Sequence, residues 1–213
     1  AGLIARGSKG CLRVAYMTFA GIELLPQAVA DFRQRSPEVA LILSYQRTEL
    51  QKVSLARGEI DVGIMLGPFA NPGFEVRELA SERVHLLVPD GHRLAGRPQT
   101  TVAEAAAEPM VLGTHEQWDF YRAMVLDILA VRGVEPNIAY EAPSLTGIVG
   151  LVRAGLGVTI VPGVVARAVP PGLAAIEIAD AGRAISTVAV WRQPAEQSTA
   201  DFAASLARVA RQD

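Results

Sequence analysis

The chain has 213 residues, of which 50% are hydrophobic and 20% charged, an ordinary composition for a globular protein long enough to bury a core. Its formal net charge of −2 gives no indication of a nucleic-acid partner for the chain as given. Cys11 is the only cysteine, which excludes an internal disulfide and a thiolate metal cluster and favours a reduced, cytoplasmic setting. No apolar run approaches the roughly 20 residues of a membrane helix, and the first residues lack the apolar core of an intact secretory signal.

The first third of the chain alternates between short apolar runs and segments with helical periodicity. The predicted strands are 12–17, 39–45 and 60–66. A helix is predicted between the first two, from about Glu23 to Ser36. Pro26 must lie in its first turn or at a bend, because proline lacks the N–H that a deeper position requires. This alternation of strand and helix predicts parallel strands joined by right-handed crossovers.

The helix that follows the second strand has signals at both ends. Thr48, with Gln51 three residues later, matches a capping box. Gly58 is typical of a helix C-terminus, where a residue without a side chain adopts the left-handed conformation easily. These signals predict a helix from about Thr48 to Gly58.

The rest of the chain continues the alternation. Strands are expected at 74–79, 83–88, 110–113, 137–141, 157–161, 173–178 and 185–191, and helices at 117–131, 144–155 and 199–211. The turn-rich stretch after Val88-Pro89 breaks the pattern, so we place one crossing between lobes there and a second near Ala184–Thr187. The sequence therefore predicts an α/β fold of two lobes joined by two crossings. Lobe I comprises 12–88 with 187–213, and lobe II comprises 89–186.

Residues that could support catalysis or bind a metal do not form a recognisable set. His85, His92 and His115 lack the spacing of metal-binding motifs, and no GxSxG nucleophile motif is present. Asp61 lies at the mouth of a strand, where a capping role is commoner than acid–base chemistry. The glycine pair in Gly155-Leu156-Gly157 follows a helix and precedes a strand, which is the reverse of a phosphate loop. We therefore expect no enzyme activity, no metal and no cofactor.

Small and polar residues recur instead where strands end. Ligands of open α/β sheets bind at the carboxyl ends of the strands, where helix N-termini present unpaired N–H groups. The residues at these ends are Thr18, Thr48, Met65, Leu66, Gly67 and Pro68 in lobe I, and Thr114, His115, Pro143, Ser144, Val161 and Pro162 in lobe II. Their number predicts a small-ligand site in a cleft between the lobes. The alternative for Thr48 and Ser144 is simple helix capping, worth about 1 kcal/mol each.

Three longer motifs carry a resemblance to a known family. They are L-x-x-G-x-I-D-V-G-I at 55–64, LLVPDGHRLA at 86–95 and VRAGLGVTIVP at 152–162. Together they resemble the effector-binding domain of LysR-type transcriptional regulators, and the resemblance covers about residues 8–211. The second motif departs from the family at Arg93, where proline is common.

The resemblance implies a fold like that of type 2 periplasmic binding proteins, with two Rossmann-like lobes and a small-molecule effector in the cleft. It also implies that residues 1–11 are the remnant of a linker and hinge. An N-terminal winged helix-turn-helix, absent from this chain, would bind DNA in the full-length protein. Family members form homodimers and homotetramers through the first long helix, here 23–36, and an edge of the second lobe. Leu25, Ala28 and Phe32 are then either core residues or divided between the core and a partner.

Family effector pockets place their contacts after the first strand, at the start of the second helix and in the second lobe. The matching positions here are Thr18, Phe19, Ala20, Thr48, Met65 to Pro68, Thr114, Pro143, Ser144 and Val161. Members that answer to aromatic-degradation intermediates share the T-x-x-Q of 48–51, but several carry an arginine after the third strand, where this chain has Leu66-Gly67-Pro68. The effector expected from the resemblance is aromatic or a carboxylate, and an apolar or aromatic ring with one polar end is as plausible as a strongly anionic compound. Redox sensing is excluded because lobe II has no cysteine.

Two other functions remain open from the sequence. A solute-binding protein of the same fold, serving transport, would be exported, and the residues upstream of Ala1 would show a signal peptide in place of a helix-turn-helix. An enzyme on this fold would turn over a small substrate and would lose that activity when a cleft carboxylate is replaced.

Overall fold

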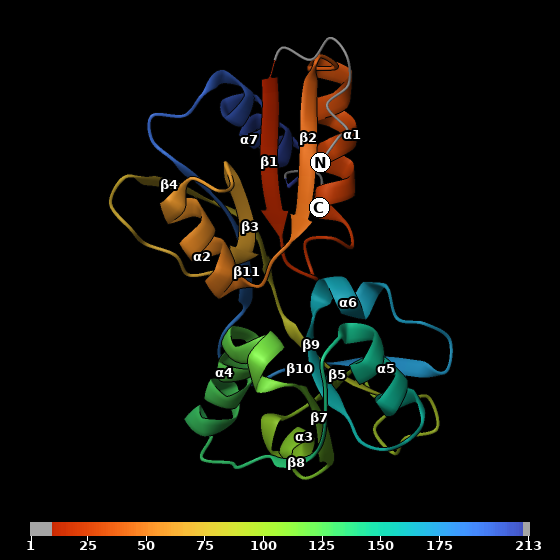
Figure 1. Cartoon of the computed structure of the whole chain (residues 1–213). Coiled ribbons are helices and arrows are strands. Elements are labelled where there is room, and N and C mark those ends of the chain that lie inside the picture. The colour runs from red at the N-terminus through yellow and green to blue at the C-terminus, as the bar shows by residue number, and fades with distance from the viewer. Residues whose placement is uncertain (1–9, 211–213) are drawn as a thin grey trace. The chain divides into compact units, whose positions relative to one another are not determined.

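A computed structural model describes residues 10–210. Most of the segment expected to be a linker remnant, 1–11, lies outside the described residues, whereas Gly10 and Cys11 begin the first strand. The chain divides into two compact units. Their described parts are residues 10–81 with 186–210, called unit 1, and residues 82–185, called unit 2. Figure 1 follows the chain from unit 1 through unit 2 and back.

Unit 1 is built on a five-stranded sheet with the strand order β2-β1-β3-β11-β4. Its elements are β1 (Gly10–Tyr16), α1 (Leu24–Arg35), β2 (Val39–Tyr45), α2 (Thr48–Arg57), β3 (Val62–Leu66), β4 (Phe74–Glu82), β11 (Ile185–Arg192) and α7 (Gln197–Val209). β1 pairs in parallel with β2 and β3, as predicted, and β11 runs antiparallel to β3. Because Tyr16 is level with Tyr45 and with Ile64, the carboxyl ends of β1, β2 and β3 lie at one edge of the sheet.

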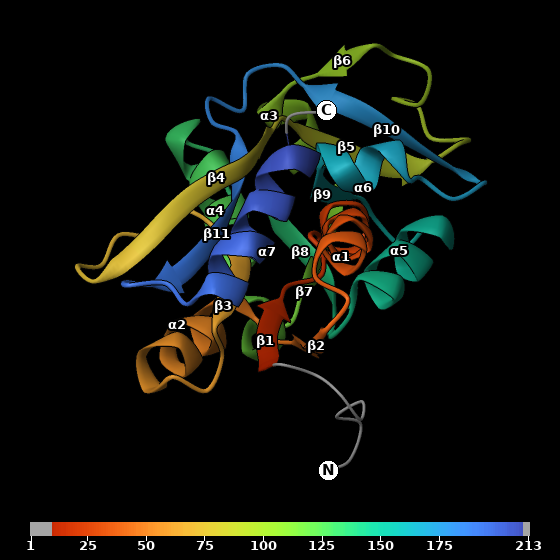
Figure 2. The ribbon, with the colours of Figure 1, turned by 90° about the horizontal axis from the view of Figure 1, so that it is seen from above.

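Helices cover both faces of this sheet (Figures 1 and 2). α1 and α7 pack together on one face, where the rings of Phe32 and Phe202 meet edge to face at 5.4 Å. α2 covers the other face, over a buried cluster that includes Ala15, Leu55, Ile60, Met65, Val188 and Val190. Leu25, Ala28 and Phe32 are all buried within the single chain, so all three are core residues and none is left for a partner.

The ends of α1 and α2 follow the sequence signals in part. Pro26 is the third residue of α1 and lies in its first turn, where its missing N–H costs nothing. Gly58 ends α2 with φ 68°, the left-handed conformation that glycine adopts without strain. The capping box predicted at Thr48 and Gln51 is wrong, because both side chains bind the ends of neighbouring strands instead.

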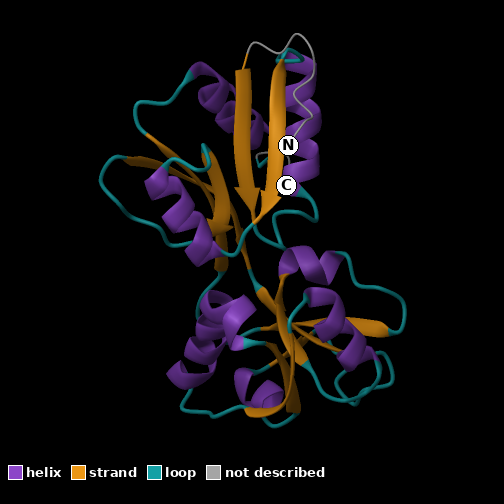
Figure 3. Cartoon of the chain, in the orientation of Figure 1, coloured by secondary structure: helices purple, strands orange, loops and turns teal. Residues whose placement is uncertain are grey.

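Unit 2 contains the remaining elements (Figure 3). They are β5 (Val84–Pro89), β6 (Gln99–Thr100), α3 (Val102–Ala106), β7 (Pro109–Gly113), α4 (His115–Val131), β8 (Asn137–Ala142), α5 (Leu145–Arg153), β9 (Thr159–Pro162), α6 (Gly163–Arg167) and β10 (Leu173–Ile178). One sheet has the order β6-β10-β5-β9, and β7 pairs in parallel with β8. A parallel bridge between Met110 and Val158 joins β7 to the residues just before β9. The ends of β7, β8 and β9 therefore lie at one edge.

Strand β5 belongs to unit 2, whereas the sequence analysis placed it in the first lobe. It pairs antiparallel with β10 and with β9. The chain leaves unit 1 between Ser81 and Glu82, ahead of the crossing expected near Val88-Pro89. Only Arg83 separates β4 from β5, so no turn signal marks this crossing and the pairing partners decide where it falls.

Three short elements of unit 2 were not predicted, namely β6, α3 and α6. β6 has 2 residues, and α3 and α6 have 5 each, which is too short for a periodic pattern to appear. α3 has the complete capping box that α2 lacks, between Thr101 and Glu104. The hydrogen bond from Arg97, helped by Thr100, lowers the pKa of Glu104 to about 2, so this cap is ionised throughout the physiological range.

Candidate functional site

The predicted site residues fall into two groups, one in each unit. The first strand-end cluster is the set Thr18, Phe19, Ala20, Thr48, Met65, Leu66, Gly67 and Pro68 in unit 1. The second strand-end cluster is the set Thr114, His115, Pro143, Ser144, Val161 and Pro162 in unit 2. Each cluster sits where parallel strands end together, as expected for an open α/β sheet.

Thr18 is the most accessible hydroxyl of the first cluster. It follows β1, and its Oγ1 donates a hydrogen bond of 3.2 Å to the phenol oxygen of Tyr45 at the end of β2. The next two residues, Phe19 and Ala20, are only 4% and 1% exposed. The turn after β1 thus buries its apolar residues in unit 1 and leaves the hydroxyls of Thr18 and Tyr45 at the strand ends.

Thr48 fastens the start of α2 to the end of β3. Its Oγ1 accepts a hydrogen bond of 3.3 Å from the backbone N–H of Leu66. One turn further on, the Gln51 side-chain amide donates to the carbonyls of Gln46 at 2.7 Å and Ile64 at 3.1 Å. T-x-x-Q is therefore a clamp that holds the ends of β2 and β3 against α2.

The end of β3 offers backbone rather than side chains. Met65 is fully buried in the core beneath α2, so its side chain is not accessible to a ligand. Gly67 donates its N–H to the carbonyl of Ser186 at 2.9 Å, and a Cβ at this position would lie 2.5 Å from the Ser186 Oγ. Gly67 thus allows β3 and β11 to approach closely, and Pro68 is exposed beside it.

The N-terminus of α2 is the polar feature of the first cluster that is most open to a ligand. Within the described residues, Arg47 makes no side-chain hydrogen bond that caps this helix. The first N–H groups of an α-helix have no partner inside the helix, and the helix dipole adds a partial positive charge there. Because the Thr48 hydroxyl is already engaged with Leu66, these N–H groups can bind an oxygen atom of a ligand.

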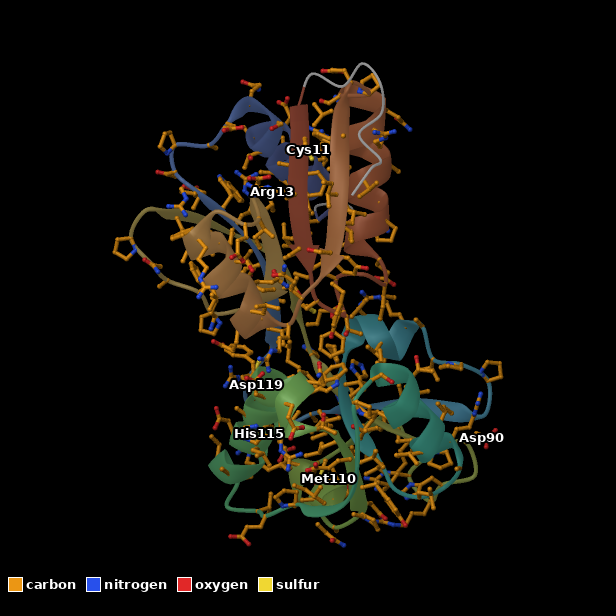
Figure 4. All side chains as sticks on the ribbon, viewed as in Figure 1. Cys11, Arg13, Asp90, Met110, His115 and Asp119 are labelled. Carbon is orange, nitrogen blue, oxygen red and sulfur yellow. The ribbon has the colours of Figure 1, made fainter. Side chains whose placement is uncertain are left out.

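The start of α4 is the corresponding feature of the second cluster (Figure 4). Thr114 precedes the helix and, in the described part of the chain, makes no side-chain cap. Its backbone N–H donates to Ala142 at 3.1 Å, which fixes this turn to the end of β8. His115, the first residue of α4, is exposed, and Figure 4 labels it together with Asp119 of the same helix.

Ser144 is a helix cap, the simpler of the two roles that the sequence left open. Its Oγ accepts a hydrogen bond of 3.1 Å from the N–H of Gly147, in the first turn of α5. At the start of α6, the Glu82 carboxylate accepts from the N–H of Val164 at 3.0 Å. Among the three helices that begin in the second cluster, α5 and α6 thus have side-chain partners, which leaves α4 as the start most available to a ligand.

Trp118 is a residue of the second cluster that the sequence analysis missed. Its indole Nε1 donates to the carbonyl of Pro143 at 3.1 Å. Its ring lies against Gly113 at the end of β7, where a Cβ would stand 2.2 Å from the indole Cγ. Its backbone dihedrals, φ −130° and ψ 18°, interrupt α4. An aromatic residue four positions after Thr114 could have drawn attention to this position. Its contacts with Gly113 and Pro143 could not be predicted from the helical periodicity of 117–131 alone.

Tyr121 extends this aromatic contact to the third strand end. Its ring meets Trp118 edge to face, with centroids 6.0 Å apart. Its hydroxyl donates to the carbonyl of Ile160 at 2.9 Å, immediately before Val161 and Pro162. Burial raises the pKa of the Tyr121 phenol, so it stays protonated and keeps this donor. Trp118 and Tyr121 together connect the ends of β7, β8 and β9.

Charged residues of both units that could serve a site have structural partners, and metal-ligating residues are not grouped in the described part of the chain. No three His, Cys, Asp or Glu residues between 10 and 210 are grouped closely enough to hold a metal ion. Arg122, near the second cluster, donates to the Gly113 carbonyl at 3.0 Å and pairs with Glu141 at 2.7 Å. Asp61 is a structural residue, since its carboxylate accepts from the backbone and guanidinium of Arg13 at 2.6–3.1 Å. None of the helices in the described range is long and apolar enough to cross a membrane.

Comparison with known proteins identifies the sequence relatives of the chain. AlsR of Bacillus subtilis (strain 168), an HTH-type transcriptional regulator, is 30% identical over 158 residues, which are 74% of this chain and 52% of AlsR. HcaR of Escherichia coli (strain K12), the Hca operon transcriptional activator, is 30% identical over 158 residues, which are 71% of this chain and 51% of HcaR. The matches span about half the length of these curated relatives. Both are named as regulators, not as enzymes or transport proteins.

Solved structures share the fold. The BenM effector binding domain with its effector benzoate matches with a TM-score of 0.84 at 22% identity, covering 96% of this chain and 92% of that one. Full-length CbnR complexed with its target DNA matches with a TM-score of 0.83 at 25% identity, covering 96% and 72%. The expected α/β fold, like that of periplasmic binding proteins, is therefore confirmed. The family profile described as LysR substrate binding domain matches residues 5–210, and the chain belongs to this family.

Proposed function

We propose that this chain senses a small-molecule effector for a cytoplasmic, LysR-type DNA-binding transcriptional regulator, and that it is not an enzyme. The effector would bind at the strand-end clusters. DNA binding would belong to a winged helix-turn-helix in the full-length protein, which would act as a homodimer or homotetramer. The names of AlsR and HcaR favour this proposal over a transport role.

The observation that carries the proposal is the pair of uncapped helix starts. α2 and α4 each begin at the carboxyl end of a parallel strand, and in the described residues neither has a side-chain cap. Unit 1 adds the hydroxyls of Thr18 and Tyr45, and unit 2 adds the aromatic residue Trp118. The N–H and O–H groups can bind the polar end of a ligand, and Trp118 can contact an aromatic ring.

The expected charge of the effector follows from the arginines. Arg122 is held by Glu141 and by a backbone carbonyl, so it is a poor partner for a strongly anionic ligand. The turn after β3, Leu66-Gly67-Pro68, supplies no cation. We therefore expect a neutral or monoanionic aromatic compound, whose oxygen is bound by hydroxyl and N–H groups. Benzoate, which BenM binds, is one member of this class to test.

A thermal-shift screen tests this function. The panel comprises benzoate, benzamide, an amino acid and a dicarboxylate, each measured with the wild type, Thr18→Val and Thr18→Ser. A ligand at a hundredfold excess over its Kd stabilises the folded state by about 2.7 kcal/mol. We expect an aromatic ligand to raise the Tm of the wild type and of Thr18→Ser, which keeps the hydroxyl, and to have a much smaller effect on Thr18→Val.

Two results would contradict the proposal in different ways. An equal Tm increase in all three proteins would show that the Thr18 hydroxyl does not contact the ligand. Turnover of any panel compound would show that the chain has enzymatic activity.

A further inference from the structure

A pocket of about 380 Å³ lies in unit 2 and shares no lining residue with the second strand-end cluster. The buried residues Val84, Ile178 and Ala181 line it, with exposed fractions of 1%, 3% and 8%. Arg83, Glu177 and Arg183 supply its charged groups. The volume is within the range of pockets that bind small molecules, about 300–1,000 Å³.

The charges of the pocket favour an anion. Arg83 is anchored, because its guanidinium bonds the Glu177 carboxylate at 2.5 Å. Among the described residues, the partner of Arg183 is distant: the exposed Asp127 carboxylate lies 3.7 Å away, which is too long for a hydrogen bond. The lining contains two guanidinium groups and one carboxylate, because the Asp127 partner of Arg183 is not part of the lining. Arg183 is therefore the group best able to exchange its partner for a bound anion.

The pocket also stands where the chain enters and leaves unit 2. Arg83 follows the last residue of β4, and Ala184 immediately precedes β11. Both strands continue into unit 1. A ligand in this pocket would therefore touch both segments through which the two units are connected.

We propose that this pocket is a second ligand site, specific for a small monocarboxylate with a short apolar body. The carboxylate pairs with the planar guanidinium of Arg183, which can donate two parallel hydrogen bonds to it. The hydrocarbon part lies against the Val84, Ile178 and Ala181 side chains of the lining. The Arg83–Glu177 pair stays intact at the rim.

Calorimetric titration with hexanoate tests the site, with hexanamide as the neutral ligand of the same length. The variants are Arg183→Gln, Glu177→Gln and the control Arg93→Gln, an exposed arginine of the same unit that pairs with Glu108 at 2.5 Å. We expect Arg183→Gln to weaken hexanoate binding at least tenfold. Glu177→Gln should strengthen it, because it removes the competing carboxylate and frees Arg83. Arg93→Gln should leave it unchanged, and hexanamide should bind more weakly than hexanoate.

Effects of opposite sign at Arg183 and Glu177 cannot come from damage to the fold, which would weaken binding in both variants. The proposal is overturned if hexanoate does not bind the wild type at millimolar concentration. It is also overturned if hexanamide binds equally well, or if Arg93→Gln loses as much affinity as Arg183→Gln. If Thr18→Val abolishes hexanoate binding and Arg183→Gln does not, the carboxylate binds at the strand-end clusters and this pocket is not its site.

Discussion

At the scale of single residues, the second strand-end cluster depends on a missing side chain. Gly113 leaves the space that the Trp118 ring occupies. A Cβ at position 113 would lie 2.2–2.6 Å from the Cγ, Cβ and Cδ1 atoms of Trp118. Trp118 in turn donates to Pro143 and contacts Tyr121. Because these Trp118 atoms lie so close to position 113, a slight shift cannot make room for a methyl group. The whole indole must move.

Gly113→Ala should therefore destabilise the fold and disturb the strand ends. Overpacking of this kind costs about 1–3 kcal/mol. The matched control is Gly150→Ala in α5, where a Cβ would meet nothing within 4 Å. That substitution should stabilise the protein by about 1 kcal/mol, because alanine is the better helix former. Urea unfolding followed by circular dichroism measures both changes, and equal stabilities for the two variants would show that the indole relocates freely.

At the scale of elements, an ion pair joins the two helices that cover one face of the unit 1 sheet. Arg208 of α7 donates to the Asp31 carboxylate of α1 at 2.6 and 3.0 Å, and Arg35 donates to it at 3.1 Å. The hydrogen bonds from Arg208, with help from Ser205 and Arg35, lower the pKa of Asp31 well below its ordinary value of 3.8. The folded state therefore binds the proton of Asp31 more weakly than the unfolded chain does.

The sign of the pH dependence follows from this shift. A carboxylate with a lowered pKa stabilises the folded state above its unfolded pKa, and this contribution is lost as the pH falls through its folded pKa. Asp31→Asn should cost about 1 kcal/mol at neutral pH, because the pair is only partly buried. This loss of stability in Asp31→Asn should become smaller below about pH 4, where the unfolded wild type binds protons. Chemical denaturation at several pH values measures this loss. The control is Glu38→Gln, which replaces an exposed acid beyond the end of α1. A loss of stability in Asp31→Asn that does not change with pH would show that the Asp31 carboxylate is not its source.

Most elements could be predicted from periodicity and end signals, and the errors in side-chain partners share one cause. The cap at Ser144 and the stop at Gly58 were predicted correctly because their partners lie within a few residues. Thr48 carries an equally good local signal, yet its hydroxyl binds Leu66, 18 residues away. Local sequence cannot show that a distant strand end will compete for a side chain. Trp118 escaped prediction for the same reason, since its contact with Pro143 depends on how β7 and β8 pair.

At the scale of the whole molecule, the same limit applies to the boundary between the units. β4 and β5 are consecutive strands with one residue between them, and nothing in their composition shows that they pair in different sheets. The order of strands and helices did predict the fold class, because parallel strands with helical crossovers have few arrangements. The sequence pattern predicted the strand ends, and the resemblance to the family added Phe19 and Ala20. The hydrogen bonds that decide which helix starts are capped come from the structure.

The edge of the unit 1 sheet bears on the assembly of the proposed regulator. Among the strands between residues 10 and 210, β2 is the outermost of its sheet and pairs with β1 alone. Ile42 and Leu43 are adjacent in β2, so their side chains point to opposite faces of the sheet. Both are nevertheless exposed, by 49% and 42%. An apolar edge strand with unpaired backbone groups favours pairing with another chain. We therefore expect this edge to contact a second copy of the chain in the proposed homodimer.

Leu43→Lys should shift the protein from dimer to monomer, because it places a charge on the edge strand without removing a core side chain. Sedimentation velocity measures the shift, and the Tm at low protein concentration should stay close to that of the wild type. The matched control is Val131→Lys at the end of α4, since Val131 is 76% exposed but lies far from β2 in the sequence and in the other unit. If Val131→Lys dissociates the dimer and Leu43→Lys does not, self-association uses a surface of unit 2 and the exposed residues of β2 require another explanation.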